Sequence, residues 1–396
     1  CAYSAIHKRV LNIEDVYSNS RFDFSGPKRY DKLTGYLTKT MLTVPLVDAD
    51  DVTIGVLQMI NAMDAQGKIV PFSGHSEKII KSLASLAAIA LSNMQYKAEL
   101  KAQMWSFTEA MATAIDERTP YNANHTRKVA EYSGKLADYI NKLHKEGKEE
   151  EEFSENRKEQ LVMATLLHDI GKLVTPLGVM NKSTRLNGRE VEIEKRLERY
   201  GLKAKVAYLE GEMDKGVYEN ITQNIDKALK VMNEINNAGF LDDGLKSALN
   251  DVIDLNYDDN GELLPFFTED EKACLQIEKG TLTYKERKIM EQHVEVTAKI
   301  LDKVHFINYF ANAPRWAAEH HELLDGTGYP NQLKGEEIAL ESRIIAVADI
   351  CDALLATDRP YKEPMPKEAA FKILRGMASS GKIDTKLVEY LYECID

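Results

Sequence analysis

The sequence predicts a mostly α-helical protein, in which a small α+β segment is followed by a long all-helical region. Two apolar runs, Met41–Val47 and Val52–Ile60, flank the acidic stretch DADD, which is typical of a β-hairpin. From Ser76 onward, apolar residues recur at alternating spacings of three and four, the period of an amphipathic helix. A chain of 396 residues exceeds what one hydrophobic core usually supports, so we expect two domains.

The helical period continues through a segment that we expect to connect the two domains, with residues 1–95 before it and 119–396 after it. The apolar stripe begins before this segment and comprises Leu83, Leu86, Ala90, Leu100, Met104, Phe107, Met111 and Ala114. Asn93 and Lys97 interrupt the stripe, which argues against a continuous coiled coil. Two interpretations stay open for the connecting helix at 96–118. It packs on a second copy of the chain in a homodimer, or it covers its own domain.

Helix start signals are clear in the second region. Thr283 with Glu286 and Thr268 with Glu271 each form the pattern of a capping box, and Pro314 suits a first helical turn. The stretch DLNYDDNGELL at 254–264 is similar to a calcium loop at first sight. Aligning its glycine with the one that the loop requires puts Phe267 where the bidentate glutamate belongs, so we reject a calcium site.

Composition and charge exclude several classes of protein. The net charge of −12 disfavours a general binder of DNA, because phosphate backbones are gripped by lysine and arginine patches. No run approaches the roughly 18 to 20 apolar residues of a membrane span. The scattered cysteines Cys1, Cys274, Cys351 and Cys394 form no CxxC pair, and no signal-peptide pattern is present, so we expect a cytoplasmic protein. Because the sequence starts at Cys1 and not at a methionine, we expect it to be a piece of a longer chain.

Histidines and aspartates give the main functional signal. Five histidines fall in predicted helices or at their edges: His125, His168, His293, His320 and His321. Asp169 ends one apolar helix, and Asp349 and Asp352 lie one turn apart on another. A buried carboxylate needs a positive partner. Imidazole and carboxylate ligands without cysteine favour iron first and manganese second over a structural zinc ion.

Five motifs in order resemble the HD-GYP family of metal-dependent phosphohydrolases. They are HTRKVAEYSGKLAD, LLHDIGK, KGTLTYKERKIMEQHVEVTAKIL, HHELLDGTGYPNQLKGEEIALESRIIAVADICDAL and DRPYK, and the resemblance covers residues 119–184 and 279–396. The resemblance implies a helical domain of the HD type that hydrolyses cyclic di-GMP. It also implies two metal sites, one with His125, His168, Asp169 and Asp349 and the other with His293, His320 and His321, with Asp169 bridging.

Further site residues follow from the same resemblance. Two metal ions roughly 3.5 to 4 Å apart activate a water and hold a phosphodiester for in-line attack. Lys172 would bind the phosphate or assist the leaving oxygen, unless it only forms a helical ion pair with Asp169. Arg359 and Lys362 would bind phosphate, and Tyr329 would shape the substrate pocket. We assign Asp352 to the substrate pocket as well, where it would orient a metal ligand or a water.

Two departures from the family pattern matter. Tyr121 stands where some members carry a glutamate that supports a third metal, so we expect two metals. More than ninety helix-rich residues, at about 185–278, separate motifs that are nearly adjacent in typical members. Because His168 and His293 must still meet, this insertion should project outward. It would modulate access or bind a partner, or be a neutral addition.

The first segment resembles the C-terminal part of a GAF sensor domain through LNIEDVYSNSRF, TKTMLTVPL and IGVLQMINA. The pattern associated with cyclic-nucleotide binding is incomplete, because Asn61 is followed by Ala62. The leading hypothesis is a GAF-regulated phosphodiesterase that converts cyclic di-GMP to pGpG, with or without further cleavage to GMP. The alternatives are a phosphodiesterase for another cyclic dinucleotide such as 3′,3′-cGAMP, or a catalytically silent module that binds a cyclic dinucleotide.

Overall fold

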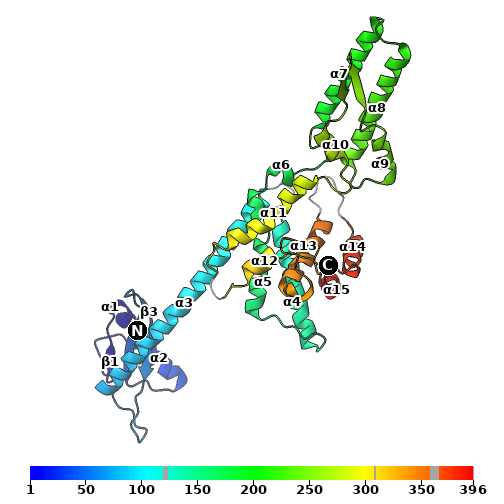
Figure 1. Ribbon diagram of the computed structural model, residues 1–396. Helices are drawn as coiled ribbons and strands as arrows, with labels where there is room; N and C mark the ends of the chain where they lie inside the picture. Colours follow the sequence, from blue (N-terminus) through cyan, green and yellow to red (C-terminus); the bar gives the residue numbers. More distant parts are fainter. Residues whose placement is uncertain (119–123, 307–308, 357–364, 396) are drawn as a thin grey trace. The chain divides into compact units, whose positions relative to one another are not determined.

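The computed structural model describes residues 1–118, 124–306, 309–356 and 365–395. The chain divides into two compact units, Cys1–Ser106 and Phe107–Asp396 (Figure 1). The predicted Arg359, Lys362 and Tyr121 lie outside the described residues. The described part of the chain contains no helix both long enough and apolar enough to span a bilayer.

The first unit contains a small antiparallel sheet and the start of a long helix. In chain order its elements are α1 (Ala2–His7), β1 (Leu11–Ile13), α2 (Ser25–Thr34), β2 (Met41–Val47), β3 (Thr53–Ile60) and α3 (Gly74–Asp116). The strand order is β1-β2-β3, and Met41 pairs with Ile60 in the β2–β3 register. This pairing confirms the predicted hairpin.

Helix α3 crosses the boundary between the two units and has two different faces in its first half. Ala84 and Ala88 are fully buried against the sheet residues Leu42 and Val44, because a methyl side chain lets the helix approach the sheet closely. Leu86 of the predicted stripe is 64% exposed. The stripe therefore does not cover its own sheet, and a different, alanine-rich face does so.

The second unit is helical around the candidate site. Its elements are α4 (His125–Lys145), α5 (Glu155–Leu167), the 3-10 helix η1 (Ile170–Val174), α6 (Leu177–Met180), α11 (Tyr284–Leu301), α12 (Ala313–Ala318), the 3-10 helix η2 (Gly335–Glu337), α13 (Leu340–Leu355), α14 (Lys367–Ser379) and α15 (Thr385–Cys394). Helix α4 packs on α5 and α13, α5 packs on α12, and η1 packs on α11. The predicted capping box of Thr283 and Glu286 is present at the start of α11.

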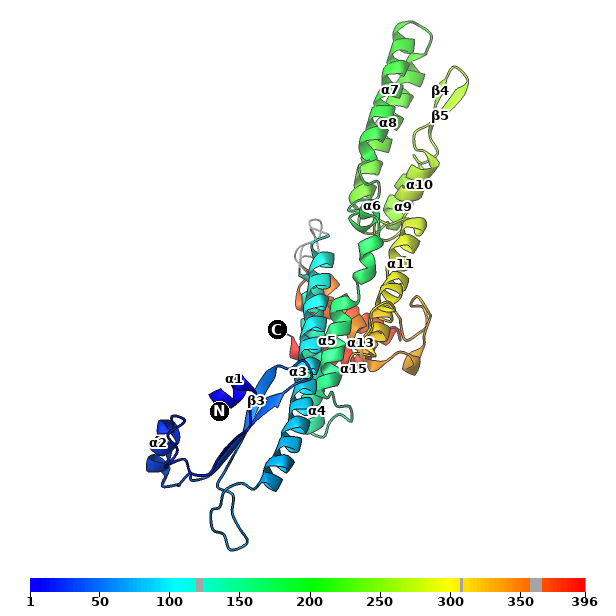
Figure 2. The same cartoon turned by 90° about the vertical axis from the view of Figure 1, so that its left-hand side faces the viewer.

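The predicted insertion has a hydrophobic core of its own. It contains α7 (Glu190–Leu209), α8 (Lys215–Asn237), α9 (Asp243–Asn250), β4 (Asn256–Asp259), β5 (Glu262–Pro265) and α10 (Glu269–Leu275). Helices α7 and α8 lie side by side (Figure 2), and apolar residues from Leu186 to Leu275 form one buried cluster. The fully buried Arg185 donates hydrogen bonds to the carbonyl oxygens of Ile235, Ala238 and Ile277 at the base of the insertion.

The β4–β5 hairpin corrects our prediction that residues 119–396 are entirely helical. Asn260 and Gly261 form its two-residue turn with φ of 56° and 92°, and Asp259 pairs with Glu262 across it. Positive φ at both turn residues matches the twist of a tight hairpin, and Asn-Gly adopts it at little cost. The Asn-Gly pair was therefore the signal of a hairpin, in the stretch where a calcium loop was rejected.

The two ends of the insertion are joined by polar contacts. Lys182 donates hydrogen bonds to both carboxylate oxygens of Glu286, at 2.9 and 2.7 Å, and the ammonium group is nearly buried. The hydroxyl of Thr281 donates to the carbonyl oxygen of Lys182 at 2.8 Å. The chain therefore leaves the surrounding helical region and returns to it at neighbouring points.

Candidate metal centre

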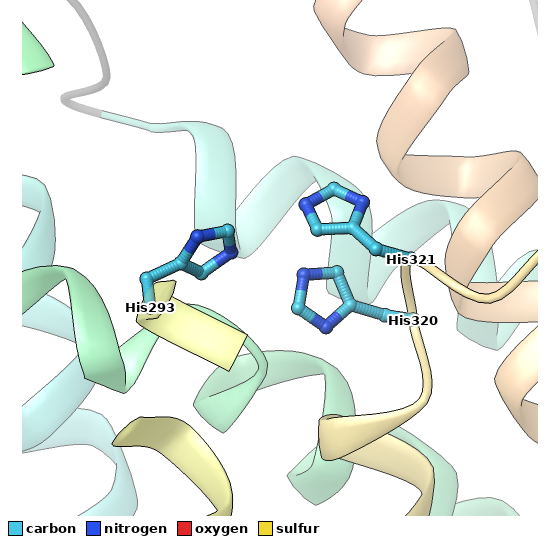
Figure 3. Close-up of side chains that lie close together, drawn as sticks. All are labelled: His293, His320 and His321. Carbon is cyan, nitrogen blue, oxygen red and sulfur yellow. The ribbon is translucent and has the colours of Figure 1, made fainter. Parts of the chain in front are cut away.

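The seven predicted metal ligands come together from five parts of the chain. His125 begins α4, His168 and Asp169 join α5 to η1, His293 lies in α11, His320 and His321 follow α12, and Asp349 lies in α13. Their ligand atoms form three overlapping groups within 4.8 Å, namely His293/His320/His321, His125/His168/Asp169 and His168/His320/Asp349. Figure 3 shows the rings of His293, His320 and His321 directed toward one another.

Three of the histidines are fixed in the tautomer that a metal requires. Nδ1 of His168 lies 2.6 Å from the carbonyl oxygen of Thr165, and Nδ1 of His320 lies 2.7 Å from that of Ala317. Nδ1 of His293 makes the same contact with the carbonyl oxygen of Met290, three residues earlier in α11. Because each Nδ1 donates its proton to a carbonyl oxygen, each Nε2 keeps a free lone pair.

The same three Nε2 atoms are buried and lack a hydrogen-bond partner among the described residues, as does Oδ1 of Asp169. Buried polar atoms are normally paired, since an unpaired one loses its hydration without compensation. Four unpaired ligand atoms facing a common space are therefore explained by a cation. The residues fit a divalent metal, and all of their donor atoms are nitrogen or oxygen.

Asp169 lies between the two sets of histidines. Its Oδ2 is 3.2 Å from Nε2 of His168 and 3.7 Å from Nε2 of His125. Its Oδ1 is 3.4 Å from Nε2 of His293 and 3.9 Å from Nε2 of His320. One carboxylate oxygen therefore faces each set, which is the arrangement of a bridging ligand.

Asp352 contacts the Nδ1 side of the His125 ring. Its Oδ2 is 2.6 Å from Nδ1 of His125, and the residue is only 2% exposed. Nε2 of His125 is directed at Asp349, at 3.2 Å from Oδ1. The carboxylate is therefore buried against the imidazole, and a contact of Asp352 with the substrate stays a prediction. Its orienting role on a metal ligand agrees with the geometry.

Burial and charge set the ionisation of the site. Burial lowers the pKa of His293 and His320, and lowers the pKa of His321 to about 4, so these three rings are neutral at pH 7. Burial alone would raise the pKa of Asp169, but His168 and Lys172 together hold that pKa well below its usual range. Burial likewise opposes the charge on His125, yet hydrogen bonds to Asp169 and other carboxylates raise its pKa. At pH 7 the site therefore holds neutral imidazoles at His293, His320 and His321, beside a protonated His125 and an ionised Asp169.

The predicted signature loop packs beside His321. The Tyr329 ring centroid lies 4.9 Å from that of His321, and burial raises the Tyr329 pKa, so the phenol stays protonated. The Tyr329–Pro330 peptide bond is cis. A Cβ on Gly328 would lie 2.3 Å from the backbone nitrogen of Leu323, so only glycine fits there. These contacts place Tyr329 at the edge of the histidine cluster.

Glu322 holds the loop that contains Tyr329, a role that the sequence did not predict. This buried carboxylate accepts hydrogen bonds from the backbone N–H groups of Asn331, at 2.6 Å, and Leu333, at 2.9 Å. It therefore fixes the chain that follows Tyr329. Its position directly after two histidines was a signal, but its partners are backbone groups, which sequence letters do not reveal.

Lys172 forms the ion pair that its spacing predicted. Its ammonium group donates to Oδ2 of Asp169, three residues earlier, and its side chain is 19% exposed. The pair therefore leaves the lysine side chain with limited access to solvent. Arg359 and Lys362, the other predicted phosphate contacts, lie outside the described residues.

Comparison with known protein families finds both kinds of domain that the motifs resemble. A GAF domain model matches residues 1–91, and two HD domain models match residues 122–234 and 270–387. The second HD match begins near the end of the insertion. The HD matches agree with the expectation of a helical domain of the HD type.

Three curated relatives illustrate the similarity. The 3′3′-cGAMP-specific phosphodiesterases 3 and 2 of Vibrio cholerae are 44% and 43% identical, over 24% and 29% of this chain. The cyclic di-GMP phosphodiesterase of Thermotoga maritima is 39% identical over 27% of this chain. The aligned parts span only 20%, 21% and 28% of these relatives' own lengths.

Proposed function

We propose that this chain is a metal-dependent phosphodiesterase that hydrolyses cyclic di-GMP to pGpG. Its matches to HD domain models, preceded by a match to a GAF domain model, support this proposal. One observation carries the proposal. Asp169 presents one carboxylate oxygen to each of two histidine sets, and three Nε2 atoms of these sets lack a hydrogen-bond partner among the described residues. The similarity to a cyclic di-GMP phosphodiesterase supports the substrate class. The product would be pGpG, with or without further cleavage to GMP.

The cofactor of this proposal is a pair of metal ions, iron first and manganese second. His125, His168, Asp169 and Asp349 would hold one ion, and His293, His320 and His321 the other. When bound, such a pair supplies Lewis acidity and makes a water nucleophilic near neutral pH. A donor set of imidazole and carboxylate without cysteine favours these ions over zinc in a structural site.

The remaining residues position the substrate and the ligands. Lys172 keeps Asp169 ionised and offers a cation at the rim, where it would contact a phosphate oxygen. Tyr329 stays a neutral hydrogen-bond donor beside His321 and would shape the pocket for the substrate. Arg359 and Lys362 would add bidentate and point-charge contacts to the phosphates. This division of labour accounts for phosphate binding by a chain of net charge −12.

A second substrate stays open, because two relatives with 43% and 44% identity are named as specific for 3′3′-cGAMP. The metal ligands determine the reaction and do not identify the bases. Both cyclic dinucleotides should therefore be assayed in parallel on the same preparation. A silent binding module is disfavoured, since every predicted ligand position holds a residue that can bind a metal.

The test is to measure metal content by elemental analysis and to identify products from each cyclic dinucleotide, with Asp169→Ala as the matched variant. About two metal ions per chain, with turnover that Asp169→Ala abolishes, would support the proposal. Metal without turnover of cyclic di-GMP but with turnover of 3′3′-cGAMP would reassign the substrate. Absence of metal from protein reconstituted with iron(II) or manganese would overturn the site.

We also infer a homodimer through α3. Leu83 and Leu86 are 55% and 64% exposed, on a face of α3 different from that buried against the sheet. A second α3 packed on this stripe would bury apolar surface that a single chain leaves in water. Light scattering of the wild type and of Leu83→Glu/Leu86→Glu tests this, since the variant should be a monomer. The GAF part would then regulate a cytoplasmic dimer, and the insertion at 185–278 would modulate access or bind a partner.

A further inference from the structure

Thr297 makes two hydrogen bonds across the candidate metal centre. Its side-chain hydroxyl donates to the carbonyl oxygen of His168 at 3.0 Å and accepts from the backbone N–H of Gly171 at 2.9 Å. Thr297 is fully buried and lies one helical turn after His293 on α11. A single hydroxyl therefore joins the turn that carries His168 and Asp169 to the helix that carries His293.

The backbones at this crossing are in direct contact. A Cβ added to Gly171 would lie 1.8 Å from the carbonyl oxygen of His293 and 2.7 Å from the backbone nitrogen of Thr297. Both neighbours are helix backbone atoms, which cannot rotate away as a long side chain could. The spacing between η1 and α11 is therefore set by backbone contact, and the Thr297 hydroxyl determines which atoms meet across it.

This crossing fixes the distance between the two sets of metal ligands. Asp169 follows His168 directly, and its Oδ1 lies 3.4 Å from Nε2 of His293. A shift of α11 along η1 would move His293 relative to Asp169 while leaving each helix intact. The hydroxyl opposes such a shift, because both of its partners on the His168–Gly171 turn are buried and would otherwise be unpaired.

We propose that Thr297 is a positioning residue for the metal centre, which holds Asp169 in register with His293. This inference rests on the proposed function, because it assigns Thr297 to the same metal site. Both of these hydrogen bonds join the Thr297 hydroxyl to backbone atoms, those of His168 and Gly171. Residues that orient metal ligands in this way typically change metal affinity about 10- to 100-fold when replaced.

The experiment compares two substitutions that separate the hydroxyl from the methyl group. Thr297→Val keeps the shape of the side chain and removes the hydroxyl, whereas Thr297→Ser keeps the hydroxyl and removes the methyl. Mn²⁺ affinity is measured by competition with a fluorescent chelator, which does not depend on activity. We expect Thr297→Val to bind Mn²⁺ about 10- to 100-fold more weakly than the wild type, and Thr297→Ser to match the wild type.

The outcomes separate this inference from the proposed function. Wild-type affinity in Thr297→Val, or an equal loss in both variants, would overturn the role of the hydroxyl. A wild type that binds no Mn²⁺ would instead overturn the metal centre itself.

If Thr297→Val does not fold, Thr297→Ser and Thr297→Ala, which both lack the methyl, give the same comparison of the hydroxyl. Thr40→Val removes a buried hydroxyl from the first unit and should leave Mn²⁺ affinity unchanged.

Discussion

The carboxylate of Asp352 and the imidazole of His125 meet at 2.6 Å, although 227 positions separate them in the chain. The contact joins α13 to the first residue of α4 and occupies Nδ1, which leaves Nε2 directed at Asp169 and Asp349. A carboxylate behind a histidine fixes its orientation and makes it a more basic ligand.

Asp352→Asn should weaken the metal site that contains His125 without unfolding the domain. The amide keeps the size of the side chain and loses the charge that strengthens the imidazole. Metal affinity should fall about 10- to 100-fold, measured by chelator competition. Asp138→Asn is the matched control, because that carboxylate also belongs to the described helical unit and its side chain is 61% exposed. Equal affinities in the two variants would contradict the role of Asp352.

Glu322→Ala should disturb the Tyr329 loop and leave the metal content intact. Two buried N–H groups, of Asn331 and Leu333, would lose their acceptor, at a cost of about 1 to 3 kcal/mol each in unfolding free energy. We expect a raised KM for the cyclic dinucleotide with two metals still bound, measured by steady-state kinetics and elemental analysis. Glu336→Ala, at an exposed position, serves as the control. Loss of metal in Glu322→Ala would show that the carboxylate supports the ligands instead.

Gly171→Ala should destabilise the protein, whereas Gly376→Ala should not. The new methyl at position 171 would overlap the His293 carbonyl, so the loss should reach or exceed the upper end of the roughly 1 to 3 kcal/mol typical of overpacking. Gly376 lies in α14 with nothing within 4 Å of an added Cβ, and alanine there should stabilise by about 0.4 to 1 kcal/mol. Thermal and urea unfolding measure both, and similar stability of the two variants would contradict the close crossing.

The metal-free protein should lose stability as the pH falls from about 6.5 to about 4. Burial lowers the folded-state pKa of His293, His320 and His321, the last from 6.5 to about 4, so in this window the unfolded chain binds more protons than the folded one. Unfolding free energy therefore rises with pH, by about 1.4 kcal/mol for each pKa unit of lowering. His125 has the opposite sign, because its pKa is raised, but its contribution is lost only as the pH rises above about 6.5, so it does not offset the slope in this window.

Urea unfolding of chelator-treated protein across this range measures the slope. His321→Asn should flatten the curve, since asparagine does not titrate. A wild-type stability that stays constant from pH 6.5 to 4 would contradict the burial of neutral imidazoles. The metal-loaded protein should show a steeper loss, because protons compete with the metal for the same nitrogen atoms.

The sequence predicted the chemical groups of the site better than the contacts that hold them. All seven proposed ligands were named beforehand, because histidine and aspartate at the ends of apolar helices carry their chemistry in the residue type. Glu322 and Thr297 were not, since each binds backbone groups whose proximity depends on the folded path of the chain. Asp352 was assigned to the substrate because its distant partner, His125, cannot be read from neighbouring residues.

The secondary structure, too, was predicted in part: local patterns were recognised and packing partners were not. The first hairpin was predicted from two apolar runs, whereas the second was missed, because its strands are short and polar. The stripe on α3 was found from its period, but the face that packs on the sheet is made of alanines, which carry little hydrophobic signal. Local patterns determine where an element forms, and its packing depends on partners elsewhere in the chain.

The Lys182–Glu286 contact at the base of the insertion has a consequence for how such a chain tolerates change. The Lys182–Glu286 ion pair holds the first and last residues of the insertion close together, and the insertion packs around its own hydrophobic core. For the rest of the domain, the insertion therefore has the same effect as a short loop that joins two neighbouring points. The entropy of closing a loop grows only with the logarithm of its length. An insertion of this kind can be lengthened, shortened or replaced by another folded segment, and the arrangement of His168 and His293 does not change as a result.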